Sequence, residues 1–376
     1  MHYVAESRLK TEESVIEKQK DLDQVVSELD DVIGMDTEFH RRRTFFPRPC
    51  VLQLSTSTGA FIVDLLAPLD LTELESALFS EDRIKVTHSP REDLELLHLI
   101  FGAELPNLVD VQLAHAFLST DAALNYSSLV ERYLDHPLEQ NKKMTQSDWR
   151  KRPLTPTQVK YAYDDVRFLL SLWDQIRSLL KKKGRLSWFL EEMQHYFRSV
   201  YEFSLSDLAA IPAQIDWNAM ELTIYFGLLE WRERTARSRN RPRERVLTQK
   251  EIKIAVEHHA EDIDFFQKHF HGFGKGLHRL ISRIKKGNSN CNDMHYSLEY
   301  KQTTRKRELF HRTKEPIKQL VAQKSESIQL ALETLGRSTQ ISNWISHYDE
   351  HHKFPPSFGA WREEVIGTEL REILNS

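Results

Sequence analysis

Three short runs of strand-forming residues, closely spaced near the start of the chain, constrain the fold more than any other feature. They occupy residues 32–38, 50–55 and 60–64, and the residues TSTG at 56–59 supply a turn between the second and third runs. Strands that follow one another at this spacing predict a β-meander. Helical patterns and a further strand come after it, so the first part of the chain is predicted to be mixed α/β.

Helical patterns make up most of the remaining sequence. A helix is predicted at residues 21–30, ahead of the first strand, and another near 71–79. A fourth strand is predicted at 84–88, and from there to about residue 200 the chain has mostly helical patterns. The strand-forming residues therefore all lie before residue 90.

Two helix starts carry the pattern of a capping box with proline at the first helical position. One is Ser89-Pro90-Arg91-Glu92, and Gly102 is expected to close its helix. The other is Thr155-Pro156-Thr157-Gln158, whose helix is predicted to continue to the lysines at 181–183 and to stop at Gly184.

The second half of the chain is predicted to be all-helical. Helical patterns cover residues 205–287 and 309–376, with a break at Pro355-Pro356, and the polar stretch GNSNCNDMHYS at 287–297 has the composition of a linker. The predicted organisation is an α/β domain at 1–200 and two all-helical domains at 205–287 and 288–376.

Composition narrows the class of protein. The net charge of −4 excludes a uniformly basic nucleic-acid binder, so any such contact must come from a local cluster. Two distant cysteines, Cys50 and Cys291, fit neither a disulfide framework nor a zinc site. The N-terminus has no apolar signal segment, and no apolar run reaches membrane-spanning length. We expect a cytoplasmic protein with no membrane contact, acting as a monomer.

Two carboxylates at the end of the first strand run have a spacing that needs an explanation. Asp36 and Glu38 are two residues apart on a predicted strand, so their side chains project from the same face. Two such charges repel each other and cost desolvation unless a cation lies between them. On its own this pattern is weak, because an exposed strand end explains it equally well.

Two helices supply further acidic residues. Asp93 is predicted in the first turn of the helix that Ser89 begins, where the helix dipole already favours a carboxylate. Tyr161 and Asp165 are four residues apart and share one helix face, bordering the apolar stripe. Asp164 turns further away and is predicted to be a surface carboxylate. Each of these placements, taken alone, has an ordinary structural explanation.

The order D-x-E, then D, then Y-x-x-x-D resembles the DEDD superfamily of 3′→5′ exonucleases, in the subclass with tyrosine in its third motif. The segments MDTEFHRRRTFFPRPCVLQLS, HSPREDLELLHLIFGAELPNLVDVQLAHAFL and SDWRKRPLTPTQVKYAYDDVRFLL are similar to the three motifs of the ribonuclease D family. The resemblance implies a ribonuclease H-like domain with a mixed sheet. More weakly, LLEWRERTARSRNRPRERVLTQKEI and FPPSFGAWREEVIGTELREIL resemble parts of helical HRDC domains, which bind nucleic acid.

The resemblance also implies a catalytic centre with two divalent metal ions, Mg²⁺ or Mn²⁺. By the family pattern, Asp36 bridges both ions, Glu38 and Asp165 complete the site that activates water, and Asp93 holds the second ion. Tyr161 orients the attacking water, since a phenol with a pKa near 10 is a positioning group at neutral pH.

Substrate contacts are expected outside the acidic set. Residues 231–245 contain seven arginines and two glutamates, and Arg232, Arg239 and Arg243 are candidate phosphate contacts. A solvated helix end and loop is the alternative. Phe45 and Phe46 are candidates for stacking on terminal bases, or else core residues. His88 is a further candidate contact, and Asp110 is expected to cap the helix that follows it.

The predicted function is a metal-dependent 3′→5′ exoribonuclease that trims 3′ ends of tRNA precursors and other structured RNAs. Two alternatives remain open at this stage: a DNA 3′→5′ exonuclease, and a non-catalytic RNA-binding protein on an exonuclease fold. The intact acidic set favours catalysis over the second alternative.

Overall fold

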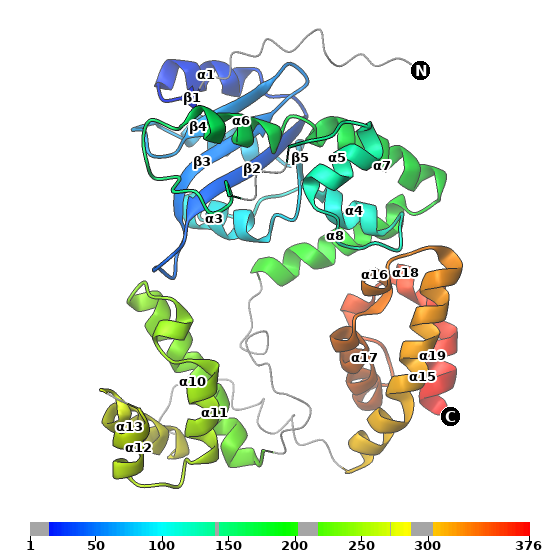
Figure 1. The fold of residues 1–376 in the computed structure, drawn as a ribbon. Helices are drawn as coiled ribbons and strands as arrows, with labels where there is room; N and C mark the ends of the chain where they lie inside the picture. The colour runs from blue at the N-terminus through cyan, green and yellow to red at the C-terminus, as the bar shows by residue number, and fades with distance from the viewer. Residues whose placement is uncertain (1–14, 140–142, 202–216, 271, 287–303) are drawn as a thin grey trace. The chain divides into compact units, whose positions relative to one another are not determined.

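The structure is a computed structural model, and it describes residues 15–139, 143–201, 217–270, 272–286 and 304–376 (Figure 1). Packing contacts divide the chain into two compact units. The first contains residues 1–40, 48–201 and 308–376, and the second contains residues 41–47 and 202–307. Each unit is described by itself below.

A six-stranded mixed sheet forms the centre of the first unit, with the strand order β1-β4-β3-β2-β5-β6. Strand β3 pairs antiparallel with both β2 and β4, which confirms the predicted meander, while the pairs β1–β4, β2–β5 and β5–β6 are parallel. The strands are β1 (Val15–Ile16), β2 (Val32–His40), β3 (Arg48–Ser55), β4 (Ala60–Asp64), β5 (Ile84–Thr87) and β6 (Leu108–Asp110). The short strands β1 and β6 were not predicted.

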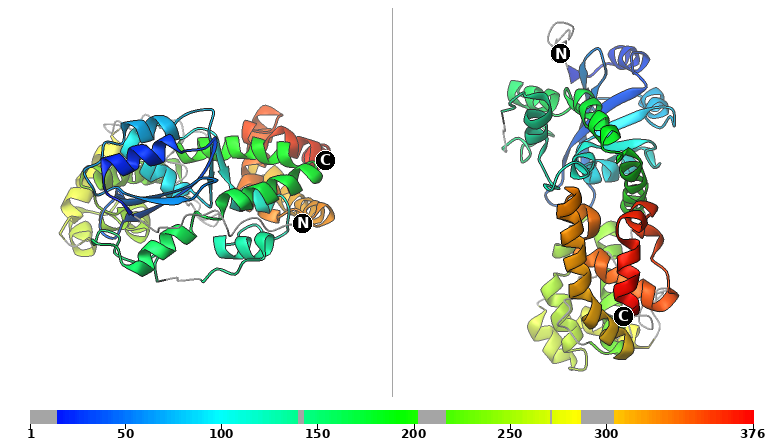
Figure 2. Two further views of the ribbon diagram at one scale, coloured as in Figure 1. Left: turned by 90° about the horizontal axis from the view of Figure 1, so that it is seen from above. Right: turned by 90° about the vertical axis from the view of Figure 1, so that its right-hand side faces the viewer.

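Helices cover both faces of this sheet. Figure 2, seen from above, shows α1 and α6 on opposite faces. The helices of this part are α1 (Gln19–Ser27), α2 (Thr72–Leu78), α3 (Arg91–Phe101), α4 (Val111–Ala116), α5 (Tyr126–Leu134), α6 (Pro156–Asp164), α7 (Leu169–Lys182) and α8 (Leu186–Tyr201). Gly34 of β2 explains how closely α7 approaches: a Cβ there would lie 2.2 Å from Ser55 Oγ and 3.0 Å from Leu169 Cβ.

One predicted capping box is present and the other is not. Thr155 and Gln158 form the reciprocal bonds expected of them at the start of α6. Ser89, in contrast, has a positive φ of 55° and caps nothing; Pro90 precedes the first helical residue of α3. The Ser89 N–H donates to Asp110 Oδ1 at 2.9 Å, and the same oxygen accepts from Gln112 N. Asp110 caps α4 as predicted, and its tertiary bond draws Ser89 away from the capping position.

The single helix predicted from Thr155 to Gly184 is divided into α6 and α7 by a turn at residues 165–168. Tertiary hydrogen bonds satisfy the backbone groups of this turn. Ser55 Oγ donates to the Val166 carbonyl at 2.9 Å, and the Phe168 N–H donates to the Tyr126 hydroxyl at 3.2 Å. The break therefore comes from partners on β3 and α5, which the local pattern does not reveal.

The C-terminal helices join the core of the first unit. They are α15 (Thr304–Ile328), α16 (Leu332–Gly336), α17 (Ser338–His351), α18 (Ala360–Arg362) and α19 (Thr368–Asn375). Arg362 is fully buried and donates to both oxygens of Glu192 in α8, at 2.7 and 2.9 Å. Arg185 donates to the carbonyls of Phe117 and Gln329. Residues 308–376 thus share a core with the sheet-containing unit, unlike the predicted division at residue 288.

The second unit is a small helical module with its own apolar core. Its helices are α10 (Ala219–Ser238), α11 (Gln249–Glu257), α12 (Ile263–His269) and α13 (Gly274–Lys285), in agreement with the helical pattern predicted over this region. Asn218, Thr248 and Asp262 accept backbone N–H groups at the starts of the first three. The rest of the predicted helical region, at residues 202–216, lies outside the described residues.

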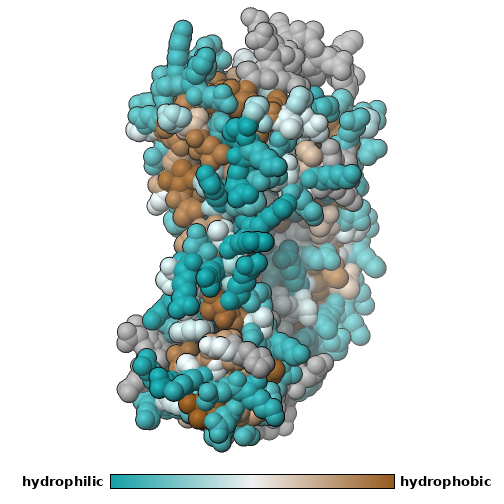
Figure 3. All heavy atoms as spheres, turned by 60° about the vertical axis from the view of Figure 1, so that its left-hand side comes forward, coloured by the Kyte–Doolittle hydropathy of each residue, from teal (hydrophilic) through white to brown (hydrophobic). Residues whose placement is uncertain are grey.

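The face drawn in Figure 3 is mostly hydrophilic, and hydrophobic side chains reach its surface in separate patches. Among the described residues, no helix combines the length and the apolar character needed to span a bilayer.

The buried ion pair between Arg362 and Glu192 should be required for stability. Replacing Arg362 with Met leaves the Glu192 carboxylate without its partner, and breaking a buried pair in this way costs about 3–5 kcal/mol. We expect a loss of about that size in urea unfolding followed by near-UV circular dichroism. The half-exposed pair Lys324–Glu369 provides the control, because Lys324→Met should cost only about 0–1 kcal/mol. Equal effects of the two substitutions would contradict the role of Arg362.

Candidate active site

Three carboxylates meet at the centre of the sheet. Asp36 and Glu38 project from the same face of β2, and Asp165 stands at the C-terminal end of α6, which lies over that face. One oxygen of each carboxylate lies within 4.8 Å of the others. The predicted convergence of strand and helix residues is therefore present in the fold.

Asp93 and Tyr161 flank this triad. Asp93 lies in the first turn of α3 and is buried, and one of its oxygens accepts a short hydrogen bond from Thr37 Oγ1. Tyr161 lies one helical turn before Asp165 and is hydrogen-bonded to its carboxylate. Thr37 lies between Asp36 and Glu38 on β2, and its side chain points to the opposite face of the strand. Its hydrogen bond connects Asp93 to the strand that carries those two acids.

Burial raises the pKa of every carboxyl in the set, and charges of other members add to this for Asp36, Glu38 and Asp165. Burial is the largest cause for Asp36, whose pKa lies well above its usual value, and the charges of Asp93, Asp165 and Glu38 add to it. Burial also raises the pKa of Glu38, with further contributions from Asp165 and Asp93. Burial is also the largest cause for the other two carboxyls: it raises the pKa of Asp93 to about 6 and that of Asp165 to about 7.

This electrostatic pattern fits a divalent cation. Buried like charges are unfavourable, and a positive ion among them replaces the repulsion by attraction. Hard cations such as Mg²⁺ bind carboxylate oxygens, and the set offers those donors from three separate elements. The residues present therefore fit a divalent metal site.

A cavity of about 400 Å³ opens beside the carboxylates. Its wall includes Asp36, Tyr161 and Asp165, and also His88, whose Nε2 lies 3.1 Å from the Leu124 carbonyl oxygen. Tyr126 also lines it, and burial together with the charge of Asp165 raises the pKa of this tyrosine. A substrate end that entered this cavity would lie beside the acidic residues.

Asp164 is half-buried rather than exposed, but it is paired away from the triad. Lys160 and Arg167 donate to its two oxygens at 2.8 and 2.9 Å. The distinction between Asp164 and Asp165 therefore agrees with the helix-face prediction, although cationic partners, rather than solvent, surround Asp164.

Comparison with known proteins places this site in a family. A family model described as 3′-5′ exonuclease matches residues 14–181. Curated relatives named ribonuclease D include one from Xanthomonas oryzae, 27% identical over 92% of this chain and 93% of its own length. Another, from Nitrobacter hamburgensis, is 34% identical over 57% of this chain and 56% of its own.

Along nearly its whole length, the chain is similar to ribonuclease D.

Solved structures support the fold along the chain. Escherichia coli RNase D, described as an exoribonuclease involved in structured RNA processing, superposes with a TM-score of 0.79 at 22% identity and covers 96% of this chain and 98% of its own. The catalytic core of RRP6 from Trypanosoma brucei superposes with a TM-score of 0.52 at 22% identity, over 73% of this chain and 80% of its own. The sheet, its helices and the helical C-terminal region thus form a known architecture.

Not all of the arginines predicted to contact phosphates are free of partners within the fold. Arg232 is buried, lies within 3.3 Å of the Leu247 carbonyl oxygen and forms an ion pair with Glu244, so it is a structural residue, unlike the prediction. Arg243 is held by Glu233 at 2.5 Å. Arg239 is exposed at the end of α10 and remains a candidate.

The two phenylalanines belong to the second unit, where residues 41–47 pack. Asn240 Oδ1 accepts from the N–H groups of both Phe45 and Phe46, at 2.9 and 3.0 Å. The Phe45 ring is buried, and the guanidinium groups of Arg243 and Arg237 lie 4.7 and 5.3 Å from its centroid. Phe45 is therefore a core residue rather than a stacking platform, whereas Phe46 is partly exposed.

Sequence reasoning missed Tyr126 as part of the site. The only local signal is Asn125, whose side chain accepts from Ser128 N and begins α5. That signal marks a helix start. It does not show that the next residue faces carboxylates more than 30 positions away along the chain.

The raised carboxyl pKa values predict how stability depends on pH without metal. An unfolded Asp titrates near 4, whereas Asp93 and Asp165 titrate near 6 and 7 in the fold. The folded state then binds more protons, so the stability from these groups is present below about pH 4 and is lost as pH rises to about 7. In EDTA, the unfolding temperature should fall from pH 5 to pH 8, and Mg²⁺ should restore it at pH 8.

Calorimetry at each pH, with and without Mg²⁺, measures this dependence. The matched control is Asp36→Asn, which removes one of the repelling charges and should give a flatter profile in EDTA. Identical profiles for the two proteins would show that the carboxylates do not set the pH dependence.

Proposed function

We propose that this protein is a divalent-metal-dependent 3′→5′ exoribonuclease that shortens RNA one nucleotide at a time and releases 5′-mononucleotides. The observation that carries the proposal is the meeting of Asp36, Glu38 and Asp165, next to a cavity that Asp36, Tyr161 and Asp165 line. Its proposed substrates are the 3′ ends of tRNA precursors and other structured RNAs. The relatives named ribonuclease D support that substrate class.

The four carboxylates are proposed to hold two ions, Mg²⁺ or Mn²⁺. When bound, these ions lower the pKa of the attacking water and neutralise charge on the leaving oxygen. Asp36 would contribute to both positions, Glu38 and Asp165 to one, and Asp93 to the other. The placement of these residues on β2, α3 and α6 gives each ligand a rigid support.

Tyr161 is proposed to position the attacking water. Burial and the charges of Asp165, Glu38 and Asp36 raise the pKa of its hydroxyl further above the usual value near 10. The phenol therefore stays protonated at neutral pH and acts by hydrogen bonding, not as a general base. Its bond to Asp165 sets the direction in which the hydroxyl points.

The helical second unit is proposed to be an HRDC-like RNA-binding module. It contains a single apolar core and carries arginines on α10 and α13 outside the catalytic unit. The C-terminal helices are proposed to derive from a second HRDC-like domain that packs with the exonuclease core.

Cleavage of end-labelled RNA tests the function. With Mg²⁺ or Mn²⁺, 3′-labelled single-stranded RNA should yield a labelled mononucleotide at once, and 5′-labelled RNA should yield a descending ladder. EDTA should abolish both. Asp36→Asn should be inactive yet folded, because it removes a metal ligand and also removes repulsion.

Three results would contradict the proposal. Cuts in circular RNA would indicate an endonuclease, and faster cleavage of the matching DNA would indicate a DNA exonuclease. No cleavage by folded wild-type protein with either metal would indicate a binding protein.

Substitutions on α6 should separate three roles. Tyr161→Phe should lower the rate about 10- to 100-fold, because water is less well placed while the metal ligands remain. Asp165→Asn should be almost inactive because a ligand is lost. Asp164→Asn should stay close to wild type, since Asp164 pairs with Lys160 and Arg167. Single-turnover rates measure all three, and an essential Asp164 with a dispensable Asp165 would refute the assignment.

A further inference from the structure

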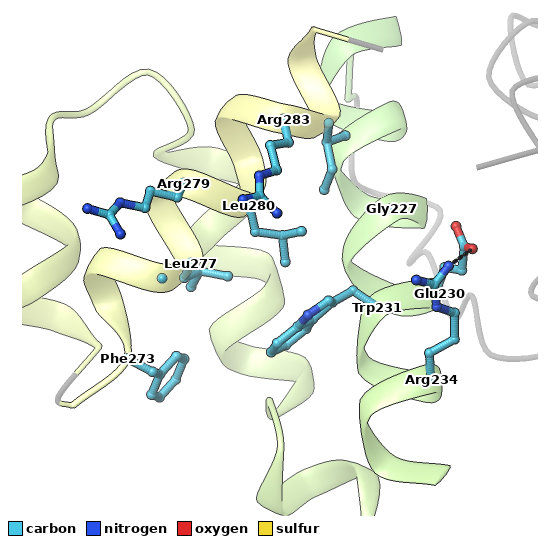
Figure 4. A pocket seen from close by; sticks show the side chains of 11 residues that line it. Gly227, Glu230, Trp231, Arg234, Phe273, Leu277, Arg279, Leu280 and Arg283 are labelled. Carbon is cyan, nitrogen blue, oxygen red and sulfur yellow. Dashed lines mark hydrogen bonds and ion pairs between the residues drawn. The ribbon is translucent and has the colours of Figure 1, made fainter. Parts of the chain in front are cut away.

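A cavity of about 540 Å³ lies in the second unit, between α10 and α13. It belongs wholly to this unit, and its volume is in the range of ~300–1,000 Å³ typical of small-ligand pockets. Figure 4 shows the side chains that line it, with the Trp231 indole from α10 extending toward α13. None of the acidic catalytic residues belongs to it.

Aromatic and aliphatic side chains form one part of the wall. Trp231, Phe273 and Leu280 are only partly buried, and each packs against the core of the unit from the cavity side. In Figure 4 the Phe273 ring stands at the start of α13, on the same side of α10 as the Trp231 ring. Rigid support from the core with ring surface left accessible is what a stacking platform for a nucleobase requires.

Arginines form the rest of the wall. Arg279 and Arg283 are exposed, stand one turn apart on α13, and both line the cavity. Within the part of the chain that the structure describes, neither has an ion pair. Arg234 of α10 also lines it, and Glu230 accepts from its guanidinium at 3.3 Å.

The charge of α13 favours a polyanion over other ligands. The segment GKGLHRLISRIKK at 274–286 contains three lysines, two arginines and one histidine, and no Asp or Glu. A basic helix beside accessible rings is complementary to a strand that carries both phosphates and bases. An acidic peptide would use the arginines and leave the rings without a partner.

We propose that this cavity holds an unstacked base of single-stranded RNA against Trp231, with neighbouring phosphates at Arg279 and Arg283. The inference rests on the proposed function in one respect, that the substrate is RNA. It assigns the contact to α13 and Trp231, in place of Arg232 and Arg243, whose guanidinium groups are engaged by Glu244 and Glu233.

Binding of RNA to the full-length protein in EDTA, where the RNA stays intact, tests the assignment. The probes are a 20-nucleotide single strand and a blunt duplex of the same sequence, measured across a salt series. Arg279→Gln with Arg283→Gln should weaken single-strand binding about ten-fold and lower the log–log salt slope by about 1.4, at ~0.7 per phosphate contact. Trp231→Leu should also weaken it about ten-fold, and the duplex should be affected less.

A blocking substitution and a matched control complete the design. A Cβ added at Gly276, which lines the cavity, meets no atom within 4 Å, so Gly276→Phe can fill the space without a backbone clash and should also weaken binding. The control is Arg241→Gln with Arg245→Gln, two exposed arginines of the same unit outside the cavity, which should lower affinity less than the α13 pair.

Two outcomes would overturn the inference. One is single-strand affinity within two-fold of wild type for both the α13 arginine pair and Gly276→Phe, a result that stands even if Trp231→Leu does not fold. The other is equal weakening of single strand and duplex by every variant, which would indicate general charge attraction. Cleavage by wild-type protein with Mg²⁺ is measured separately, so a failed exonuclease proposal is distinguishable from a failed binding site.

Discussion

Repulsion among closely placed, largely desolvated carboxylates is the interaction on which the catalytic unit depends. Asp36, Glu38 and Asp165 are held close together with Asp93 beside them. Burial raises the pKa of each, and the charges of nearby carboxylates add to it. Such a cluster lowers the stability of the protein without metal, so the rest of the fold must compensate. The same repulsion favours the binding of divalent cations, since their positive charge removes it.

The acidic residues lie on rigid elements of the fold. Strand β2 is bonded on both sides, by β3 and β5, and α6 begins with a complete capping box. Behind the sheet-containing core, Arg362 and Arg185 tie the C-terminal helices to α8 and to the residues around Phe117. The C-terminal helices thus stabilise the unit that contains the acidic site. They are part of that unit rather than a separate helical domain.

Arginines of the second unit have different roles according to their surroundings. In α10 and the loop after it, Arg232 and Arg243 are engaged by acids and carbonyls, and Arg243 also covers the buried Phe45 ring. On α13, Arg279 and Arg283 line a cavity together with Trp231. The side chains suited to a phosphate strand are those whose charge is not already neutralised within the fold.

The sequence by itself determined the meander and the helical second half, because strand periodicity and capping patterns are local signals. The acidic set followed from the order of three motifs that resembles a known family, since each motif alone has an ordinary structural explanation. Only the tertiary structure decided that Ser89 does not cap α3, that a turn at 165–168 divides the third-motif helix, and that Arg232 and Phe45 are core residues. For Ser89, the turn and Phe45, the deciding partners Asp110, Ser55 and Asn240 lie 21, 111 and 195 positions away along the chain. A local pattern carries no information about such a partner, because hydrogen bonding and burial depend on what the fold brings next to a residue.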